Sequence, residues 1–297
     1  MTLSIRPADP ARPDFFGEAS GIDLRRPISR DEAAEIEAGM DRFAVLVFHD
    51  QRIDDEQQLA FTRNFGPLEL ATGDIQQTQR RLAMEVNDIS NLDRDHKVLG
   101  RDDRARLFSL GNMLWHSDSS FKPTPAKYSL LSARVIPSSP GGNTEFADMR
   151  AAWDALDGDT RALVRDLVCE HSQIYSRGIL GFTDFTAEER VKWAPVLQRL
   201  VRRHPVTGRR NLYLSAHAGT IVGWPVPEAR ALLRDLVEHA TQRQFVHAQE
   251  WRQFDLVMWD NRATMHRARR YDHTQVRDMR RTTIAGSAPT VEQVRAA

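Results

Sequence analysis

The sequence predicts an α+β, mainly β fold, in which a double-stranded β-helix, or jelly roll, forms a core wrapped by helices. Many short segments have strand character, and the helices between them lack the strict alternation with strands that a parallel sheet requires. No repeat, low-complexity tract or linker interrupts the 297 residues. We therefore expect a single domain over residues 1–297, a length that β-rich domains often reach as one unit.

Two capped helices and one buried strand are expected near the N-terminus. Ser29 and Glu32 have the spacing of a capping box, which predicts a helix from Ser29 to about Asp41. Asp54 is the expected cap of a second helix, because acidic residues follow it and are favourable at a helix N-terminus. Between these helices, residues 43–48 form a run of apolar, β-branched and aromatic side chains, which predicts a buried strand.

The segment 69–111 is polar and poorly periodic, so we expect a loop that contains one short strand at 82–86. Long loops in compact domains are more often lids or binding segments than plain connections. We therefore predict that residues 69–111 form an active-site loop or lid.

The rest of the chain mixes strands with helices. Strands are expected at 128–136, 144–149, 245–251, 255–259 and 280–286, and a hairpin over 204–214. Helices are expected at about 149–156, 159–169, 187–194 and 227–240, and a loop at 178–183. The single cysteine, Cys169, excludes an intrachain disulfide, and we interpret it as an inert core residue in a helix.

Charge and composition exclude several classes of partner. Acidic and basic residues balance at 41 each, so no excess positive field is available for nucleic acid or an anionic membrane surface. No apolar run approaches the roughly 18–20 residues of a membrane span, and the first residues lack the apolar core of a signal peptide. One cysteine is compatible with a reducing compartment. We expect a cytoplasmic protein.

Three residues could hold a metal ion. His116 and Asp118 are two positions apart, so in an extended strand their side chains point to the same face. His266, far downstream, offers a second imidazole. Two histidines and one carboxylate on one face of ferrous iron leave coordination positions open, which is our hypothesis. A zinc hydrolase would use the same ligand types, and His-x-Asp alone is common by chance as a surface pair.

The neighbouring motifs show a resemblance to a known family. They are Trp115-His116-Ser117-Asp118, the segment 141–146 (Gly-Gly-Asn-Thr-Glu-Phe), Trp259-Asp260-Asn261-Arg262 with His266, and Arg281-Thr282-Thr283. Over most of its length the chain resembles the iron(II)/2-oxoglutarate dioxygenases of the taurine and 2,4-dichlorophenoxyacetate dioxygenase family. Residues 128–133 and 146–156 are most similar to the branch that cleaves aryloxyalkanoates.

This resemblance implies roles for individual residues. His116, Asp118 and His266 match the iron ligands, and no further catalytic side chain is expected. Thr144 and Arg277 match the pair that holds the distal carboxylate of 2-oxoglutarate, which a guanidinium can grip with two hydrogen bonds. Substrate contacts are expected from four residues: Arg281 for an anionic group, and Asn112, His217 and Ile75. For Asn112 a turn, and for His217 a structural position, are equally consistent with the sequence.

The resemblance also implies a reaction. The enzyme would hydroxylate the carbon next to the ether oxygen of an aryloxyalkanoate such as 2,4-dichlorophenoxyacetate. The products would be a phenol and a 2-oxo acid, with succinate and carbon dioxide from 2-oxoglutarate and dioxygen. Sulfonates or alkyl sulfates are the alternative substrates, since Arg281 would bind such anions too, and a metal-binding jelly roll without activity is the alternative outside enzymes. A homo-oligomer is expected.

Overall fold

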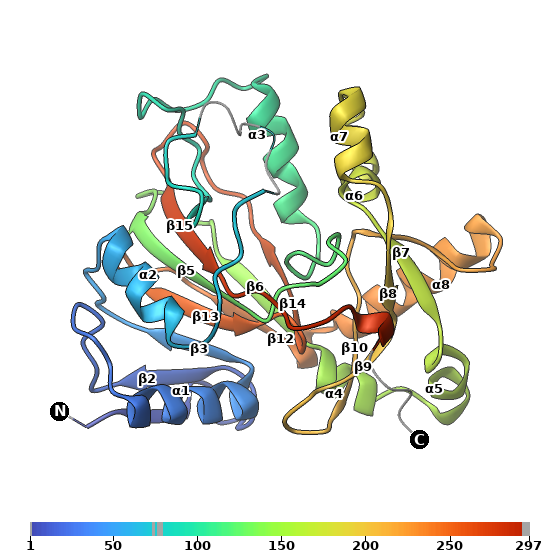
Figure 1. Cartoon of the computed structure of the whole chain (residues 1–297), viewed down its shortest axis with the longest axis horizontal. Coiled ribbons are helices and arrows are strands. Elements are labelled where there is room, and N and C mark those ends of the chain that lie inside the picture. Colours follow the sequence, from blue (N-terminus) through green and yellow to red (C-terminus); the bar gives the residue numbers. More distant parts are fainter. Residues whose placement is uncertain (1, 73–74, 76–79, 293–297) are drawn as a thin grey trace.

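The computed structural model describes residues 2–72, 75 and 80–292. Its centre is a sandwich of two sheets that run mainly antiparallel, with helices on both outer faces (Figure 1). The larger sheet contains, in spatial order, β1 (Ser4–Pro7), β2 (Gly17–Ser20), β3 (Val45–Phe48), β13 (Leu256–Asp260), β5 (Tyr128–Val135), β15 (Asp278–Thr283) and β4 (Asn87–Asp88). The smaller sheet contains β12 (Val246–Gln249), β6 (Thr144–Asp148) and β14 (Thr264–Ala268).

Two further small sheets and a set of helices surround this sandwich. The small sheets are β11 (Ala218–Ile221), β7 (Val168–His171) and β8 (Val196–Arg199), and the pair β10 (Arg210–Leu212) and β9 (Val201–Arg203). The α-helices are α1 (Arg30–Phe43), α2 (Asp55–Arg63), α3 (Arg104–Ser109), α4 (Met149–Asp154), α5 (Gly158–Val164), α6 (Gln173–Ile179), α7 (Ala187–Lys192) and α8 (Val226–Ala240). Short 3₁₀ turns are η2 (Leu110–Met113), η3 (Arg243–Phe245) and η4 (Thr290–Glu292).

The alternation of side chains along β3 explains why its sequence is apolar throughout. Val45 and Val47 point between the two sheets, where they join a cluster with Phe146 of β6. Leu46 and Phe48 point to the opposite face, into a cluster covered by α1 and α2. A strand that is buried on both faces reads as a continuous hydrophobic run. The predicted buried strand and the predicted jelly-roll core wrapped by helices are therefore both present.

Local capping explains where the first two helices begin. Ser29 Oγ accepts the backbone N–H of Glu32, whose carboxylate accepts the N–H of Ser29, so the predicted capping box of α1 is formed. Asp54 and Gln57 form the equivalent box at the start of α2. Each box satisfies backbone donors that have no partner within the helix. Both sequence predictions are confirmed.

Two predicted elements were wrong because pairing across space decided the structure. Residues 84–86 form a turn, and the strand β4 lies just after the predicted strand at 82–86, at Asn87–Asp88, where it pairs with Arg280 and Arg281 of β15. The helix predicted at 159–169 ends at Val164. The segment after it becomes β7, which pairs with both β8 and β11.

Cys169 therefore lies in a strand and not in a helix. Its side chain is fully buried, and burial raises the pKa of the thiol to about 12. A thiol with so high a pKa is a poor nucleophile at neutral pH. The interpretation of Cys169 as an inert core residue is supported, although its secondary structure was predicted wrongly.

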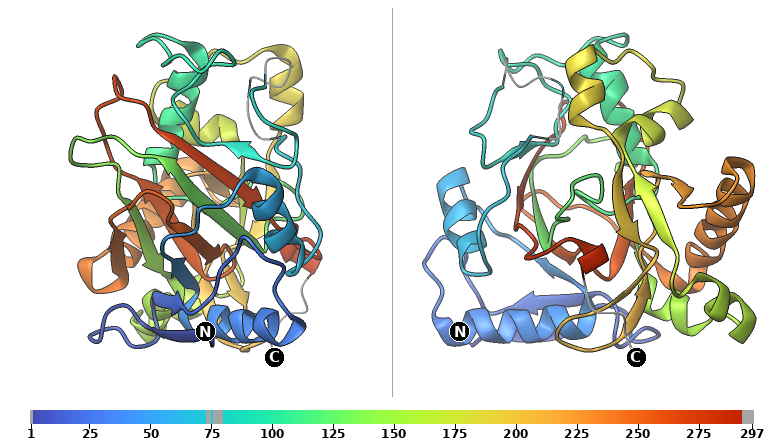
Figure 2. Two further views of the ribbon diagram at one scale, coloured as in Figure 1. Left: turned by 90° about the vertical axis from the view of Figure 1, so that its left-hand side faces the viewer. Right: turned by 45° about the vertical axis from the view of Figure 1, so that its right-hand side comes forward.

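The helices α3, α6 and α7 gather at the end of the molecule opposite α1 (Figures 1 and 2). Of these, α3 and α6 were missed: α3 lies in the predicted loop 69–111, and no element was predicted for residues 173–177, which form most of α6. Asp103 caps α3 and Ser172 caps α6, each by accepting backbone N–H groups. Among the described residues, no helix combines the length and the apolar character needed to cross a bilayer.

Candidate active site

The three predicted metal ligands converge at one edge of the smaller sheet. His116 and His266 exchange backbone hydrogen bonds of 3.0 and 2.8 Å, which place residue 116 directly beside β14. His116 Nε2 lies 3.9 Å from Asp118 Oδ1, and His266 Nε2 lies 3.9 Å from Asp118 Oδ2. All three side chains are buried, and one potential ligand atom from each lies within 4.8 Å of the others.

The convergence does not come from a regular strand, as the sequence had indicated. Residue 116 forms a single bridge with β14, and the chain turns at Asp118. Ser119 has a left-handed backbone with a φ of 56°. This turn carries Asp118 back toward both imidazoles. The side chains of His116 and Asp118 do point to the same site, as predicted. They do so because a single β-bridge is followed by a turn, and not because both residues belong to one extended strand.

Hydrogen bonds fix the orientation of His116 and Asp118, whereas the Nδ1 atom of His266 has no hydrogen-bond partner among the described residues. His116 Nδ1 donates to the carbonyl oxygen of Leu114 at 2.7 Å, so Nε2 is left free as an electron-pair donor. Asp118 Oδ2 accepts the hydroxyl of Ser129 at 2.8 Å, and Oδ1 forms an ion pair with Arg281. The carboxylate is therefore held by protein donors while its free electron pairs face the imidazoles.

The protonation states of the three residues suit a cation. Burial acts to raise the pKa of Asp118, but opposing influences, of which the positive charge of Arg281 is the largest, outweigh it and hold that pKa at about 2. Burial lowers the pKa of His116 and of His266, which keeps both rings neutral. An ionised carboxylate and two neutral imidazoles are the forms that bind a divalent metal.

A buried asparagine connects the two halves of the site. Asn261 Oδ1 accepts the backbone N–H of Asp118 at 3.2 Å and the indole N–H of Trp259 at 3.0 Å. Its amide nitrogen donates to Ser129 Oγ at 2.9 Å. The sequence motif containing Trp259 and Asn261 was recognised, but no role was predicted for Asn261 or Ser129. Only the fold shows that both residues orient Asp118.

Replacing Asn261 with alanine should therefore weaken metal binding. The change leaves the buried N–H groups of Asp118 and Trp259 without their acceptor and removes the hydrogen bond that Ser129 Oγ accepts. Loss of such supporting contacts typically lowers metal affinity by about 10–100-fold. Calorimetric titration with Mn(II) measures this, and Asn64→Ala on the exposed end of α2 is the control. Unchanged affinity in Asn261→Ala would show that the network has no such role.

Arg277 is a buried cation, separate from the metal triad, that has no acidic partner among the described residues. Its side chain is 6% exposed, and among the described residues no carboxylate lies within ion-pair distance. Its guanidinium donates weakly to the carbonyl of Ile89 at 3.4 Å and lies 5.2 Å from the centre of the Tyr271 ring. Burial lowers the pKa of Arg277. A buried cation of this kind is costly unless an anion joins it, so the donor set fits a carboxylate ligand.

The turn before β6 brings Thr144 to the same region. Gly141 and Gly142 have φ values of +113° and +75°, and a Cβ built on Gly142 would lie 3.8 Å from Arg277 Nε. Thr144 is buried, and its hydroxyl accepts the indole N–H of Trp251 at 3.0 Å. The predicted glycine turn thus leads from Arg277 into the strand that begins at Thr144.

The family model described as "Taurine catabolism dioxygenase TauD, TfdA family" matches residues 4–283. The chain belongs to this family. It is 47% identical over 282 residues to the alpha-ketoglutarate-dependent 2,4-dichlorophenoxyacetate dioxygenase of Cupriavidus pinatubonensis, covering 95% of this chain and 98% of that protein. It is 39% identical to the (S)-phenoxypropionate/alpha-ketoglutarate-dioxygenase of Sphingobium herbicidovorans, covering 85% of each chain.

Solved structures agree with this assignment. The crystal structure of AAD-2 in complex with Mn(II) and N-oxalylglycine matches with a TM-score of 0.94 and 60% sequence identity, covering 98% of this chain and 100% of that one. These findings confirm the predicted jelly-roll fold and the predicted enzyme class, a dioxygenase that depends on 2-oxoglutarate.

The remaining predicted residues of the dioxygenase lie near the triad. Arg281 faces the space between the sheets, on the same side of β15 as Met279, and its Nη1 pairs with Asp118. His217 is buried, with its ring centre 6.1 Å from that of His116 and 5.0 Å from that of Phe121. Its Nδ1 has no hydrogen-bond partner among the described residues.

Ile75 and Asn112 lie close to α3, Ile75 against the aromatic cluster that contains Phe108, and Asn112 in the 3₁₀ turn that follows the helix. Ile75 packs against an aromatic cluster formed by Phe108, Phe182, Phe185 and Trp193, and Phe121 packs against the same cluster. Asn112 is half-buried in η2, four residues before His116, and the structure assigns its side chain no hydrogen bond to the described residues. Of the four residues predicted to contact substrate, Arg281 and His217 have direct contacts with metal ligands, and Ile75 and Asn112 do not.

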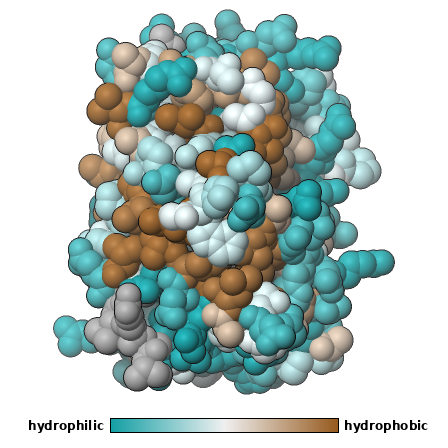
Figure 3. Space-filling view, turned by 90° about the vertical axis from the view of Figure 1, so that its right-hand side faces the viewer, coloured by the Kyte–Doolittle hydropathy of each residue, from teal (hydrophilic) through white to brown (hydrophobic). Residues whose placement is uncertain are grey.

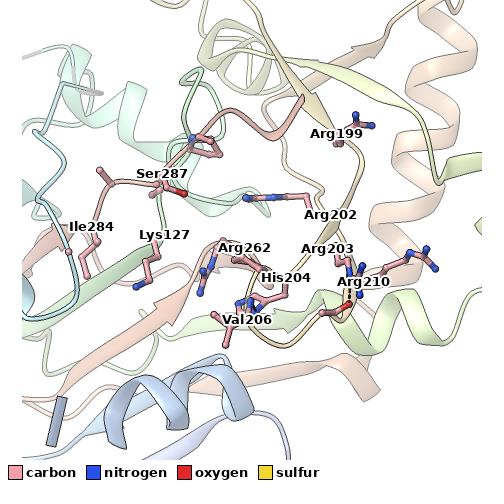
Figure 4. A pocket seen from close by; sticks show the side chains of 18 of the residues that line it. Lys127, Arg199, Arg202, Arg203, His204, Val206, Arg210, Arg262, Ile284 and Ser287 are labelled. Atoms are coloured by element: carbon pink, nitrogen blue, oxygen red, sulfur yellow. Dashed lines mark hydrogen bonds between the residues drawn. The ribbon is translucent and has the colours of Figure 1, made fainter. Parts of the chain in front are cut away.

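Two hollows lie outside the region of the metal triad. A basic cavity of about 1060 Å³ is lined by cationic residues that include Lys127, Arg199, Arg202, Arg203, Arg210 and Arg262 (Figure 4). An apolar groove of about 640 Å³ lies between α6 and α8, and Figure 3 shows apolar side chains gathered on the face that carries α8. Neither hollow is lined by a metal ligand.

Proposed function

We propose that the protein is an iron(II)/2-oxoglutarate-dependent dioxygenase that hydroxylates the carbon next to the ether oxygen of an aryloxyalkanoate such as 2,4-dichlorophenoxyacetate. The hydroxylated product is a hemiacetal, which collapses to a phenol and a 2-oxo acid. One dioxygen molecule and one 2-oxoglutarate are consumed, and succinate and carbon dioxide are released. The observation that carries this proposal is the buried His-Asp-His triad near a buried arginine, Arg277, that has no acidic partner.

The triad residues would hold the iron. Two imidazoles and one carboxylate occupy one face of the ion and leave positions for 2-oxoglutarate and dioxygen. When bound with these co-substrates, iron supplies the oxidising power for hydroxylation. Ser129 and Asn261 keep the Asp118 carboxylate in place, and Leu114 keeps His116 in the required tautomer.

Arg277 and Thr144 would receive the distal carboxylate of 2-oxoglutarate. A guanidinium donates two parallel hydrogen bonds to a carboxylate, and a hydroxyl can add a third. Burial excludes water, which strengthens this charge pair. The same ligand would supply the counter-charge that Arg277 lacks among the described residues.

An apolar aromatic ring would enter from the side of the Phe108 cluster. Ile75 and Phe121 pack against that cluster, and the Phe121 ring meets His217. These side chains offer the mainly apolar walls that aryl ligands require, with a few polar groups to set orientation. This arrangement supports an aryl ether as substrate over a short aliphatic sulfonate such as taurine.

The segment 69–111 is proposed as the lid over this site. Glu69 accepts hydrogen bonds from Ser119, next to the ligand Asp118, and from Lys122. Ile75 reaches the aromatic cluster, while residues 73–74 and 76–79 lie outside the described part of the chain. Although β4 and α3 give the segment more structure than predicted, it still connects the triad to the proposed substrate side.

We further propose that residues 1–297 form one dioxygenase domain that works in the cytoplasm as a homo-oligomer. The family model spans nearly the whole chain, which supports a single domain. Light scattering of the purified protein measures the oligomeric state. A monomeric mass at micromolar concentration would contradict that part of the proposal.

One assay tests the reaction directly. Purified protein with iron(II), 2-oxoglutarate and oxygen is given 2,4-dichlorophenoxyacetate, taurine or an alkyl sulfate, and oxygen uptake, succinate and released phenol or sulfite are measured. Phenol and succinate in equal amounts from the first substrate, without sulfite from taurine, is the expected result. Release of sulfite or sulfate at a higher rate would contradict the proposed substrate class.

A further inference from the structure

Positive charge is concentrated in the lining of the basic cavity that Figure 4 shows. Seven lysine and arginine side chains line this cavity, against one acidic side chain, that of Asp166. The whole chain has 41 residues of each sign, so the excess of positive charge is local. Cavities that are lined by one sign of charge concentrate ions of the opposite sign. The lining therefore favours an anion.

Only part of this positive charge is balanced by acidic residues of the described chain. Lys127, Arg165 and Arg262 each form an ion pair, at distances of 2.8, 3.3 and 2.7 Å. The other four cations of the lining have no ion pair among the described residues: Arg199, Arg202, Arg203 and Arg210. The cavity thus has a net positive charge that the described residues leave unbalanced.

Arg202 of β9 is the buried member of this unpaired set. It is 6% exposed, and its Nε and Nη1 have no hydrogen-bond partner among the described residues. Its guanidinium carbon lies 4.6 Å from the centre of the Tyr213 ring, a cation–π contact that helps to fix its orientation. Figure 4 shows the Arg202 side chain extending from β9 across the cavity toward Ser287. Arg202 is therefore a buried cationic donor that points into the cavity.

The surroundings of Arg202 are unfavourable for a cation. Burial lowers the pKa of Arg202, and the positive charge of Arg262 acts in the same direction. The carboxylate that opposes these effects, Asp260, already pairs with Arg262 and, at 3.0 Å, with His204. A buried guanidinium with unpaired donors is costly unless an anion joins it. An anion in the cavity would supply the charge that Arg202 lacks.

Three further arginines add positive charge at the rim of the cavity. Arg203 of β9 lies directly opposite Arg210 of β10, and like charges in such positions destabilise an antiparallel pair. Alternation along β9 places Arg203 on the other face of the strand from Arg202. Arg199 and Arg210 point away from the centre of the cavity in Figure 4. These three arginines raise the local potential, and Arg202 is the residue placed to contact an anion.

One wall of the cavity is apolar and includes Phe65, Pro67, Pro125 and Ile284. The volume of about 1060 Å³ is at the upper end of the range for small-molecule sites, which is about 300–1000 Å³. A single phosphate or carboxylate group would leave most of this space empty. A guanidinium binds the oxygens of either group with two parallel hydrogen bonds. The cavity therefore suits an organic anion that has both a charged head and an uncharged part.

The basic cavity adjoins the metal site but is separate from it. Arg262 directly follows Asn261, which orients Asp118, and the backbone N–H of Asn261 donates to the carbonyl oxygen of Lys127 at 3.0 Å. None of the three metal ligands lines the cavity, and neither does Arg277. A ligand bound here would therefore be distinct from 2-oxoglutarate and from the substrate of the proposed reaction.

We propose that the basic cavity binds a small organic anion with two or more negative charges, with its charged head on Arg202 and Arg262 and its uncharged part along the apolar wall. Asp260 engages Nε and Nη2 of Arg262, so Nη1 is the donor that Arg262 would offer. The charged head is a diphosphate or a polycarboxylate, since both groups match guanidinium donors. This site is independent of the proposed dioxygenase reaction.

Calorimetric titration of the metal-free protein with pyrophosphate, ADP and citrate tests the proposal. We expect one site for pyrophosphate and for ADP, with ADP bound more tightly because its nucleoside can cover the apolar wall. Arg202→Met should raise both dissociation constants by about 10–100-fold, the effect of losing hydrogen bonds to a charged group. Tighter binding of citrate than of pyrophosphate would identify the charged head as a polycarboxylate. Equal affinity for ADP and pyrophosphate would overturn the role of the apolar wall.

Two control variants locate the bound anion. Arg209 belongs to the same hairpin as Arg202, but it is exposed, pairs with Asp154 and does not line the cavity. Arg209→Met should therefore keep the affinity for pyrophosphate. Arg277→Met should keep it too, because Arg277 lies outside the cavity. If Arg277→Met loses the affinity and Arg202→Met retains it, the anion binds at the proposed 2-oxoglutarate position and the proposal is wrong.

Ser287→Glu is a second variant, which decides the question even if Arg202→Met does not fold. Ser287 is exposed and lies across the cavity from Arg202 in Figure 4, so a carboxylate there would supply the missing counter-charge from within the protein. We expect Ser287→Glu to melt at the same temperature as the unchanged protein or a higher one, and to bind pyrophosphate at least about 10-fold more weakly.

Thermal melting with and without pyrophosphate gives an independent readout. A ligand that binds only the folded state raises the melting temperature, so pyrophosphate should stabilise the unchanged protein and Arg209→Met more than Ser287→Glu or Arg202→Met. Two results would overturn the proposal: no binding of any of the three anions at millimolar concentration, or equal binding by the unchanged protein and Ser287→Glu. Neither result depends on whether the protein releases a phenol.

Discussion

Asp118→Asn is expected to abolish turnover and to weaken metal binding by at least about 100-fold. Asparagine nearly preserves the shape of the side chain but removes the charge that two neutral imidazoles cannot replace. It also leaves Arg281 without its ion-pair partner. Iron content after gel filtration and calorimetric titration with Mn(II) measure the loss, and succinate formation measures turnover.

Asp260→Asn provides a matched control for this experiment. Asp260 is also a buried aspartate, but it pairs with Arg262 and with His204 at 3.0 Å and is not one of the three clustered ligands. We expect Asp260→Asn to lower the melting temperature and to keep metal stoichiometry in the protein that remains folded. Full turnover by Asp118→Asn, or equal loss of metal in both variants, would contradict the assignment of Asp118.

Arg277→Met is expected to have the next largest effect, an increase of the KM for 2-oxoglutarate by about 100–4000-fold. Removing one partner of a buried charge pair costs about 3–5 kcal/mol, and each 1.4 kcal/mol corresponds to a factor of ten. The affinity for Mn(II) alone should not change, since Arg277 is outside the triad. Initial rates at varied 2-oxoglutarate and binding of N-oxalylglycine measure the effect.

Arg270→Met is the control for Arg277→Met. Arg270 lies seven positions earlier, on the exposed connection between β14 and β15. The Arg270→Met variant should therefore keep both the KM for 2-oxoglutarate and the affinity for Mn(II). An unchanged KM for 2-oxoglutarate in Arg277→Met would show that another cation binds the distal carboxylate.

Several arginines of this protein are buried and have no acidic partner among the described residues. A guanidinium that is enclosed by protein and lacks an acidic neighbour costs stability in the absence of ligand. Arg277, Arg177 and Arg202 are buried in this way and have no ion pair among the described residues, whereas Arg81 and Arg262, which are also buried or nearly so, pair with aspartates. The difference separates arginines whose charge is balanced within the fold from arginines whose charge is not.

The sequence alone predicted the elements whose signal is local. The capping boxes at Ser29 and Asp54 require residues only three positions apart, and the run at 43–48 is apolar because its strand is buried on both faces. The metal triad, Thr144 and Arg277 were predicted because they match positions of a known family, in or close to short motifs. Each of these signals is contained in a few adjacent residues.

The tertiary structure decided what depends on partners that are distant along the chain. Residues 168–171 became a strand because β8 and β11 flank them, and a single bridge to His266 positioned His116. Asn261 could be assigned to Asp118 only once the chain segments were packed together. The reason is physical: whether a polar side chain is paired or left unpaired depends on the burial and the neighbours that folding creates, and a one-dimensional pattern contains neither.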